Sequence, residues 1–374
     1  MQNSMKRLCF LLCAVLALAC QKPKTLEPGS WDPAVRESLN DLMKEARGGY
    51  AVFDFDKTSI VHDVSQALWV YQIEHLCFAD APSHHFLDGI PDPSRLIPGS
   101  DVSFAKMGEM LQMQYTLLKN FRDHGQSWEQ IHDMVLYRDF RARMFSLLVG
   151  MDEAFGEEVS YLWMPGLLAG YTEAEARKLV HDAVLEHLGR DKLAVEEWRS
   201  KDGKWGGLVE RGIWFPPEMK DLYRCLERDG IRAYVCSASL ELIVEVLACD
   251  PELGAGLPPE RVFGLRFAPS ERLTAVFDSS YVQPMGPGKV ACIEALIAPS
   301  YDGRGPVLVG GDSNGDVPML TAFEDMRCGL IIDVGRSRTS PIGELAALAR
   351  SGDGRYLLQP AFARADGAVE GGGI

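Results

Sequence analysis

The stretch that decides the fold is Ala51-Val-Phe-Asp-Phe-Asp-Lys-Thr-Ser-Ile60, in which an apolar run ends in two carboxylates. Residues 50–53 have the length and the residue types of a buried strand. Side chains two positions apart in a strand point the same way, so Asp54 and Asp56 would crowd one spot at its carboxyl end. A divalent cation relieves such crowding, and so do different protonation roles for the two carboxylates. For this pair alone, a solvated turn after an edge strand is the simpler alternative.

The composition of the chain limits the classes of function. Its 374 residues carry a formal net charge of −15, and their number allows one large domain or two. No cluster of Lys and Arg interrupts the acidic balance, which argues against a nucleic-acid surface. The composition favours an enzyme that acts on small ligands.

Residues 1–19 have the pattern of a signal peptide. Two basic residues precede an apolar stretch, 8–19, which is too short to span a bilayer. The segment ends in Leu16-Ala-Leu-Ala-Cys20, which loosely resembles a bacterial lipoprotein signal. We therefore expect export to the periplasm or cell surface, with a lipid on Cys20 as the only membrane contact. Ordinary secretory cleavage is the alternative.

The remaining chain divides into a core and an insert. Residues 20–48 form a tether and a helix, 34–46, and the tail 364–374 is expected to be disordered. In 49–60 and 216–363, helices alternate with strands, which predicts an α/β fold with a doubly wound parallel sheet. After the first strand, the expected strands are 233–236, a hairpin of 262–267 and 273–277, 307–310, and 330–334.

The insert, residues 61–215, shows almost no strand-like alternation, so we expect a separate helical cap domain. Its clearest helix spans 172–188, because Thr172 and Glu175 form a capping box and Gly189 supplies the stop. The other expected helices are 64–76, 104–120 and 128–148.

Polar residues follow each strand of the core that can be placed. Ser237 follows one strand, Lys289 opens a helix, and Asp312-Ser-Asn-Gly-Asp316 follows the next strand. Ligands of doubly wound sheets bind at the carboxyl ends of the strands. We therefore expect these residues to meet Asp54 and Asp56 at one point.

Taken in this order, these residues resemble the haloacid dehalogenase superfamily of phosphohydrolases. Asp54-Phe-Asp56-Lys-Thr58 resembles its first motif, Ser237 its second, Lys289 its third, and Gly311-Asp-Ser-Asn-Gly-Asp316 its fourth. The resemblance covers the core only. A helical insertion directly after the first motif is similar to the cap of the phosphoserine phosphatase branch, which also includes phosphocholine phosphatases.

The resemblance implies a Mg²⁺-dependent phosphomonoesterase. Asp54 would be the nucleophile that forms an aspartyl-phosphate, and Asp56 the general acid and base. Mg²⁺ would be held by Asp54, Asp312 and the carbonyl of Asp56. Asp56 points to a phosphatase or a phosphotransferase, because dehalogenases of the superfamily lack this carboxylate and ion-pump ATPases carry Thr there.

The resemblance also implies supporting roles. Ser237 and Lys289 would hold the phosphoryl oxygens, and Thr58 would position Asp56. Asp316, with Ser313 beside it, would orient Lys289 or a metal-bound water.

Simpler alternatives exist for several of these residues. Ser239 could replace Ser237 as the phosphate ligand. Lys289 could be a solvated residue after the turn Gly286-Pro-Gly288, and Asp316 could simply favour a helix start. Asn314 departs from the phosphoserine phosphatase pattern, in which an Asn stands next to the second Asp.

Two features of the insert bear on the substrate. Asp63 stands where phosphoserine phosphatases place a Glu that contacts the substrate ammonium, and the shorter side chain leaves room for a bulkier cation such as choline. Aromatic side chains could form a cage for a quaternary ammonium ion, although packing in a helical core is the alternative. They are Trp69, Trp128, Trp163, Trp198, Trp205, Trp214 and Tyr161.

We expect a small phosphomonoester as substrate: phosphoserine, phosphocholine or phosphoethanolamine. Export favours scavenging of a head group over serine biosynthesis. The alternatives are a phosphotransferase of the same fold and a non-catalytic surface lipoprotein that only binds a ligand. The second is disfavoured because the chain keeps both Asp54 and Asp312.

Overall fold

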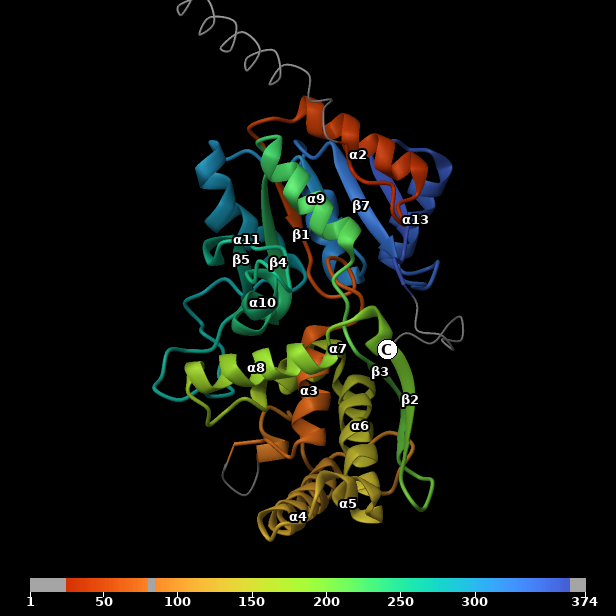
Figure 1. Ribbon diagram of the computed structural model, residues 1–374, viewed down its shortest axis with the longest axis vertical. Helices are drawn as coiled ribbons and strands as arrows, with labels where there is room; N and C mark the ends of the chain where they lie inside the picture. The colour runs from red at the N-terminus through yellow and green to blue at the C-terminus, as the bar shows by residue number, and fades with distance from the viewer. Residues whose placement is uncertain (1–24, 80–84, 364–374) are drawn as a thin grey trace, which may run out of the picture.

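The computed structural model describes residues 25–79 and 85–363 (Figure 1). The predicted signal peptide, Cys20 and the tail 364–374 lie outside these residues. The core occupies the upper half of Figure 1 and the cap the lower half. Within the described part of the chain, no helix combines the length and apolar character needed to cross a membrane.

The core is built on one parallel sheet, and the predicted α/β class is confirmed. Its six strands lie in the order β5-β4-β1-β6-β7-β8. Since the chain order reverses between β1 and β6, these neighbours mark the switch point at which doubly wound sheets bind ligands. The strands are β1 (Tyr50–Phe53), β4 (Arg232–Leu240), β5 (Val262–Leu265), β6 (Leu308–Gly311), β7 (Cys328–Asp333) and β8 (Tyr356–Pro360).

Strand β1 is central because both of its faces are buried. Ala51 and Phe53 belong to one apolar cluster, and Tyr50 and Val52 to another on the opposite face. Helices α2 (Pro33–Glu45) and α9 (Pro217–Arg228) contribute to the first cluster, and α10 (Glu241–Ala248) packs on β4 and β5. The second cluster contains side chains of α11 (Pro287–Cys292), α12 (Val317–Ala322) and α13 (Pro341–Ser351).

The expected hairpin of 262–267 and 273–277 is present only where the two segments approach their connecting loop. Residues 262–265 are the edge strand β5, which pairs with β4 in parallel, and all four of its residues are buried. An antiparallel bridge between Phe267 and Phe277, flanked by backbone hydrogen bonds from Asp278 to Arg266 and from Ala268 to Val276, joins the two segments. Burial on both faces in the main sheet offers β5 more apolar contact than a hairpin would.

The cap has its own apolar core, which is separate from the two clusters of the sheet. It contains an antiparallel hairpin that the sequence did not predict, β2 (Ala194–Arg199) with β3 (Gly206–Arg211). Trp198 and Val209 are the buried side chains of these strands, so neither carries the apolar alternation that identifies a strand. The helices are α3 (Val64–Glu74), α4 (Phe104–Asp123), α5 (Trp128–Asp133), α6 (Val135–Phe155), α7 (Glu157–Gly166) and α8 (Glu173–His187).

The helix expected over 128–148 is two helices. Met134 adopts an extended conformation (φ −65°, ψ 138°) that ends α5 and begins α6. The capping box expected at the start of α8 is confirmed, with Thr172 and Glu175 bonded reciprocally.

Two chain segments connect the cap to the core as a short hinge. Val61 and Trp214 exchange backbone hydrogen bonds of 2.7 and 3.2 Å. Next to them, the Lys57 ammonium lies 3.4 Å from the Glu210 carboxylate. The chain therefore leaves the core for the cap directly after the first motif, so the cap lies over the carboxyl end of β1.

Candidate active site

The sheet brings the first and fourth motifs together at its switch point. Asp54 follows β1 and donates its backbone N–H to the Gly310 carbonyl of β6, at 3.0 Å. Asp312 follows β6, and both aspartates are buried. The convergence expected at the carboxyl ends of these strands is present.

Lys289 lies between two of the carboxylates. Its ammonium donates to Asp54 Oδ1 and Asp316 Oδ1, both at 2.6 Å, and the residue is 2% exposed. Burial alone would lower the pKa of Lys289, but Asp316 and Asp54 outweigh burial and raise it. The solvated alternative for Lys289 is therefore wrong.

Asp316 holds the fourth motif in shape. Its Oδ2 accepts from the backbone N–H groups of Asp312 and Ser313, both at 3.0 Å, and from the Ser313 hydroxyl at 2.9 Å. Its other oxygen accepts from Lys289. Both oxygens of Asp316 are thus engaged in positioning its neighbours, which makes Asp316 a supporting residue.

Asp56 is fixed by two hydrogen bonds. Its Oδ1 accepts from the Val64 N–H at 2.7 Å, and its Oδ2 from the Ser239 hydroxyl at 2.6 Å. Burial raises the pKa of Asp56 well above its usual range, and Asp63 adds to the rise. Burial therefore favours the protonated form of this carboxyl, which is the form that a general acid uses.

Thr58 does not contact Asp56 in the expected way. Its hydroxyl lies 3.3 Å from Asp54 Oδ2 and 3.3 Å from Asp312 Oδ1. The helix start at Val64 and Ser239 hold Asp56 instead, because the chain after Thr58 turns back toward Asp56 before it enters α3.

Ser237, Asp63 and Asn314 make internal hydrogen bonds. The Ser237 hydroxyl accepts from the Ser239 N–H at 3.1 Å, within β4. Asp63 caps α3 by accepting from the Gln66 N–H at 2.8 Å. Asn314 Oδ1 accepts from the backbone of α13, so it is engaged in packing. The substrate roles of Ser237 and Asp63 stay predictions.

Arg336 was not among the site residues predicted from the sequence. Its Nη2 donates to Asp312 Oδ2 at 2.9 Å, from the loop after β7. The available signal was its place three residues after Asp333, where β7 ends at the carboxyl edge of the sheet.

The donors at this point fit a divalent cation. Carboxylate oxygens of Asp54, Asp312 and Asp316 lie within 4.8 Å of one another. With the positive charges of Lys289 and Arg336, these three carboxylates leave one net negative charge when all are ionised. Burial, with a contribution from Asp316, raises the pKa of Asp54 to about 7.

Two of these oxygens are free to ligate the cation. Asp54 Oδ2 and Asp312 Oδ1 share long contacts to the single Thr58 hydroxyl, which can donate to one of them only. Hard oxygen donors of this kind suit Mg²⁺.

The aromatic cage proposed from the sequence is wrong for most of its members. Trp69, Trp163, Trp198 and Trp205 are buried in the core of the cap. Tyr161 of α7 differs from these tryptophans because it lies near the acidic residues of the active site. Burial raises its pKa, and Asp63, Asp312 and Asp56 lie close enough to add to the rise.

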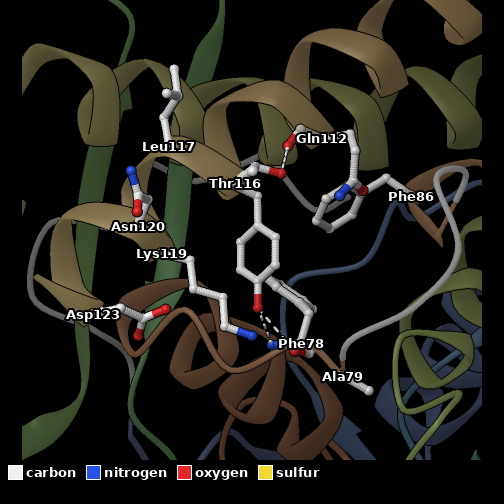
Figure 2. Close-up of a pocket in the computed structure, with 10 residues that line it drawn as sticks. Phe78, Ala79, Phe86, Gln112, Thr116, Leu117, Lys119, Asn120 and Asp123 are labelled. Atoms are coloured by element: carbon white, nitrogen blue, oxygen red, sulfur yellow. Dashed lines mark hydrogen bonds between the residues drawn. The ribbon is translucent and has the colours of Figure 1, made fainter.

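One cavity lies away from the switch point. It measures about 620 Å³ and lies in the cap beside α4 (Figure 2). None of the acidic residues of the switch point lines this cavity, so it does not bear on their chemistry.

Comparison with known proteins agrees with the motifs identified in the sequence. A family model for haloacid dehalogenase-like hydrolases matches residues 125–321, more than half of the chain. Phosphorylcholine phosphatase of Pseudomonas aeruginosa strain PAO1 is 26% identical over 266 residues, which cover 68% of this chain and 60% of that protein. The chain therefore spans less than two thirds of this relative's length.

Two solved structures are also similar. A conserved protein of unknown function from Anaerococcus prevotii DSM 20548 superposes with a TM-score of 0.78 at 27% identity, over 92% of this chain and 99% of that chain. A substrate-bound phosphoserine phosphatase gives a TM-score of 0.35 at 12% identity, over 76% of this chain and 86% of that chain.

The family match contains three of the four motifs. It begins within the cap, after Asp54, and takes in Ser237, Lys289 and Asp312. The first motif lies next to them in space through the pairing of β1 with β6. The chain therefore belongs to the haloacid dehalogenase-like hydrolases.

Proposed function

We propose that this protein hydrolyses a small phosphomonoester through an aspartyl-phosphate on Asp54. The observation that carries the proposal is the contact of Lys289 with Asp54, beside a second carboxylate, Asp56, that is held by hydrogen bonds of its own. This pair of carboxylates offers a nucleophile and a proton donor two residues apart.

A Mg²⁺ ion would be held by Asp54 and Asp312, with the Asp56 carbonyl as the expected third protein ligand. When bound, it would supply positive charge that offsets the charge of the phosphate dianion. Asp316 and Ser313 would keep the Asp312 backbone in place through the hydrogen bonds described above.

The residues of the chain then have distinct tasks. A carboxylate oxygen of Asp54 attacks phosphorus while the ester P–O bond breaks, and Asp56 gives its proton to the leaving alkoxide. Asp56 next takes a proton from the water that hydrolyses the aspartyl-phosphate. Lys289 has three N–H donors, of which two hold carboxylates, so the third can hold a phosphoryl oxygen with Ser237.

The proposed leaving group is a small amino alcohol, with choline preferred. Asp63 supplies a buried carboxylate near Asp56, and Tyr161 supplies an aromatic side chain nearby. A carboxylate and an aromatic face together favour a quaternary ammonium group. The similarity to a phosphorylcholine phosphatase supports this choice. We also propose export, with a lipid on Cys20, from the sequence of residues 1–20.

The test is phosphate release by the protein from Gln21 onward, with and without Mg²⁺. The panel contains phosphocholine, phosphoethanolamine, phosphoserine, a sugar phosphate and an aryl phosphate. We expect Mg²⁺-dependent release with a preference for phosphocholine. Release that increases with an added acceptor alcohol would indicate phosphotransfer. Binding without release from any substrate would favour the non-catalytic alternative.

Ser239→Ala should lower kcat about tenfold and leave KM nearly unchanged. The substitution removes the hydroxyl that donates to Asp56 Oδ2 at 2.6 Å, so the general acid loses part of its orientation. Steady-state kinetics with phosphocholine would measure the effect. Ser38→Ala is the matched control and should keep the wild-type rate, because the exposed Ser38 hydroxyl bonds the backbone of α2, at the Ala34 carbonyl. Equal rates for Ser239→Ala and wild type would contradict the role given to Ser239.

Asp63→Asn should raise KM for phosphocholine about tenfold and change KM for an aryl phosphate little. Asn keeps the helix cap but removes the charge that would attract the ammonium group. The comparison of the two substrates separates a lost contact from a general defect. A rise in KM that is equal for both substrates would argue against a cation site at Asp63.

A further inference from the structure

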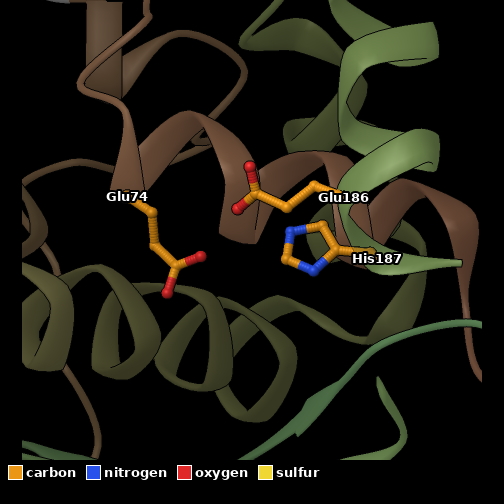
Figure 3. A group of neighbouring side chains, drawn as sticks. All are labelled: Glu74, Glu186 and His187. Atoms are coloured by element: carbon orange, nitrogen blue, oxygen red, sulfur yellow. The ribbon is translucent and has the colours of Figure 1, made fainter. Parts of the chain in front are cut away.

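A second group of ligating side chains lies in the cap. Glu74 ends α3, and Glu186 and His187 end α8 (Figure 3). One ligand atom of each lies within 4.8 Å of the other two. These residues take no part in the chemistry of the active site.

The imidazole of His187 is the unusual member of this group. The residue is 4% exposed, and its Nε2 is buried without a hydrogen-bond partner among the described residues. In Figure 3 the ring points toward the gap between the two carboxylates. A buried polar atom without a hydrogen-bond partner is unfavourable, so a ligand in this gap would remove that penalty.

The surroundings of His187 suit metal binding. Burial, together with the neighbouring Arg211 guanidinium, lowers the pKa of the ring to about 4. Its Nε2 makes no hydrogen bond to Glu74 or Glu186, although the three side chains lie close enough to share one ion. A neutral imidazole nitrogen with carboxylate oxygens is a ligand set typical of Zn²⁺, whereas Mg²⁺ prefers oxygen alone.

The two carboxylates differ in how their charge is matched. Arg211 donates to Glu74 at 2.8 Å, and Glu196, which Arg211 also contacts, has Arg141 as a second partner, so Glu186 is the carboxylate without a guanidinium partner among these ion pairs. Glu186 contacts a second imidazole, with His75 Nε2 3.0 Å from its Oε2. Such outer contacts orient metal-ligating carboxylates.

We propose that Glu74, Glu186 and His187 form a Zn²⁺ site that ties the ends of α3 and α8 together. The site is structural, because it lies in the cap and contacts none of the residues assigned to the reaction.

The site would stabilise the cap where it meets the hinge. Helix α3 begins at Val64, whose N–H holds Asp56, and it ends at Glu74. The His187 carbonyl accepts from the Ile213 N–H at 2.9 Å, next to the hinge residue Trp214. A cation between α3 and α8 would therefore fix two elements that lead directly to the core.

The test uses calorimetric titration of the metal-stripped protein with Zn²⁺, in a large excess of Mg²⁺. We expect one Zn²⁺ site that Mg²⁺ does not fill, a higher Tm with Zn²⁺, and a nitrogen ligand in the X-ray absorption spectrum. Glu186→Gln should weaken Zn²⁺ binding at least about tenfold, since loss of a ligand exceeds loss of an outer contact. The side chain of Glu186 is 44% exposed, so this variant should fold.

Controls assign the ion to this site. Glu109→Gln, on the exposed face of α4, should bind Zn²⁺ as wild type does. His187→Gln should lose Zn²⁺ binding, and Asp312→Asn should keep it. Zn²⁺ binding that is lost in Asp312→Asn and unchanged in Glu186→Gln would place the ion at the active site and overturn the proposal. Absence of Zn²⁺ binding by the wild type would also overturn it, and would indicate that water fills the gap.

Discussion

Asp54→Asn should reduce phosphate release at least about a thousandfold, as is typical when a nucleophile is removed. The amide has nearly the shape of the carboxylate, so the Lys289 contact and the packing after β1 can persist. It lacks the negative charge needed to attack phosphorus and to bind a cation. The loss should therefore appear in kcat for every substrate of the panel, because the aspartyl-phosphate step is common to all of them.

The measurement is the rate of phosphate release at saturating substrate and Mg²⁺, with circular dichroism to check folding. Asp302→Asn is the matched control, because the Asp302 side chain is 97% exposed. A folded Asp54→Asn protein with a rate within about tenfold of wild type would exclude Asp54 as the nucleophile.

Lys289→Met should destabilise the fold by about 3–5 kcal/mol at neutral pH without Mg²⁺. The ammonium is the hydrogen-bond partner that Asp54 and Asp316 share, both at 2.6 Å in a buried site. Met fills a similar volume but leaves two buried carboxylates without this cation. Urea unfolding of the variant and of wild type measures the difference.

The destabilisation by Lys289→Met should depend on pH in a defined direction. Without Lys289, the pKa of Asp54 rises further above its value in the unfolded chain, because the lysine lowers it in the wild type. The folded variant then binds more protons than the unfolded chain, so its unfolding free energy rises relative to wild type as the pH falls from about 8 to about 5.

Lys44→Met, at a side chain that is 58% exposed, is the control and should show little effect at any pH. A destabilisation by Lys289→Met that stays constant across this range would argue that lost packing, and not the unpaired carboxylates, is the cause.

The sequence by itself determined the class of the core and most of the candidate site. Apolar runs that end in Asp54, Asp56 and Asp312 identify strands with polar carboxyl ends, and a parallel sheet must bring such ends to one edge. The helix that begins after Thr172 was equally predictable, because its capping box is a local pattern. The match of 125–321 to the hydrolase family agrees with these local signals.

The tertiary structure alone decided which side chains touch. Ser239 bonds Asp56 across 183 positions of sequence, and Arg336 bonds Asp312 from a loop without a motif. The hairpin β2–β3 and the grouping of Glu74 with His187 likewise depend on how the cap packs. Local patterns encode helices, strands and turns, whereas contacts between distant segments depend on the shape of the assembled core, which no single stretch of the chain contains.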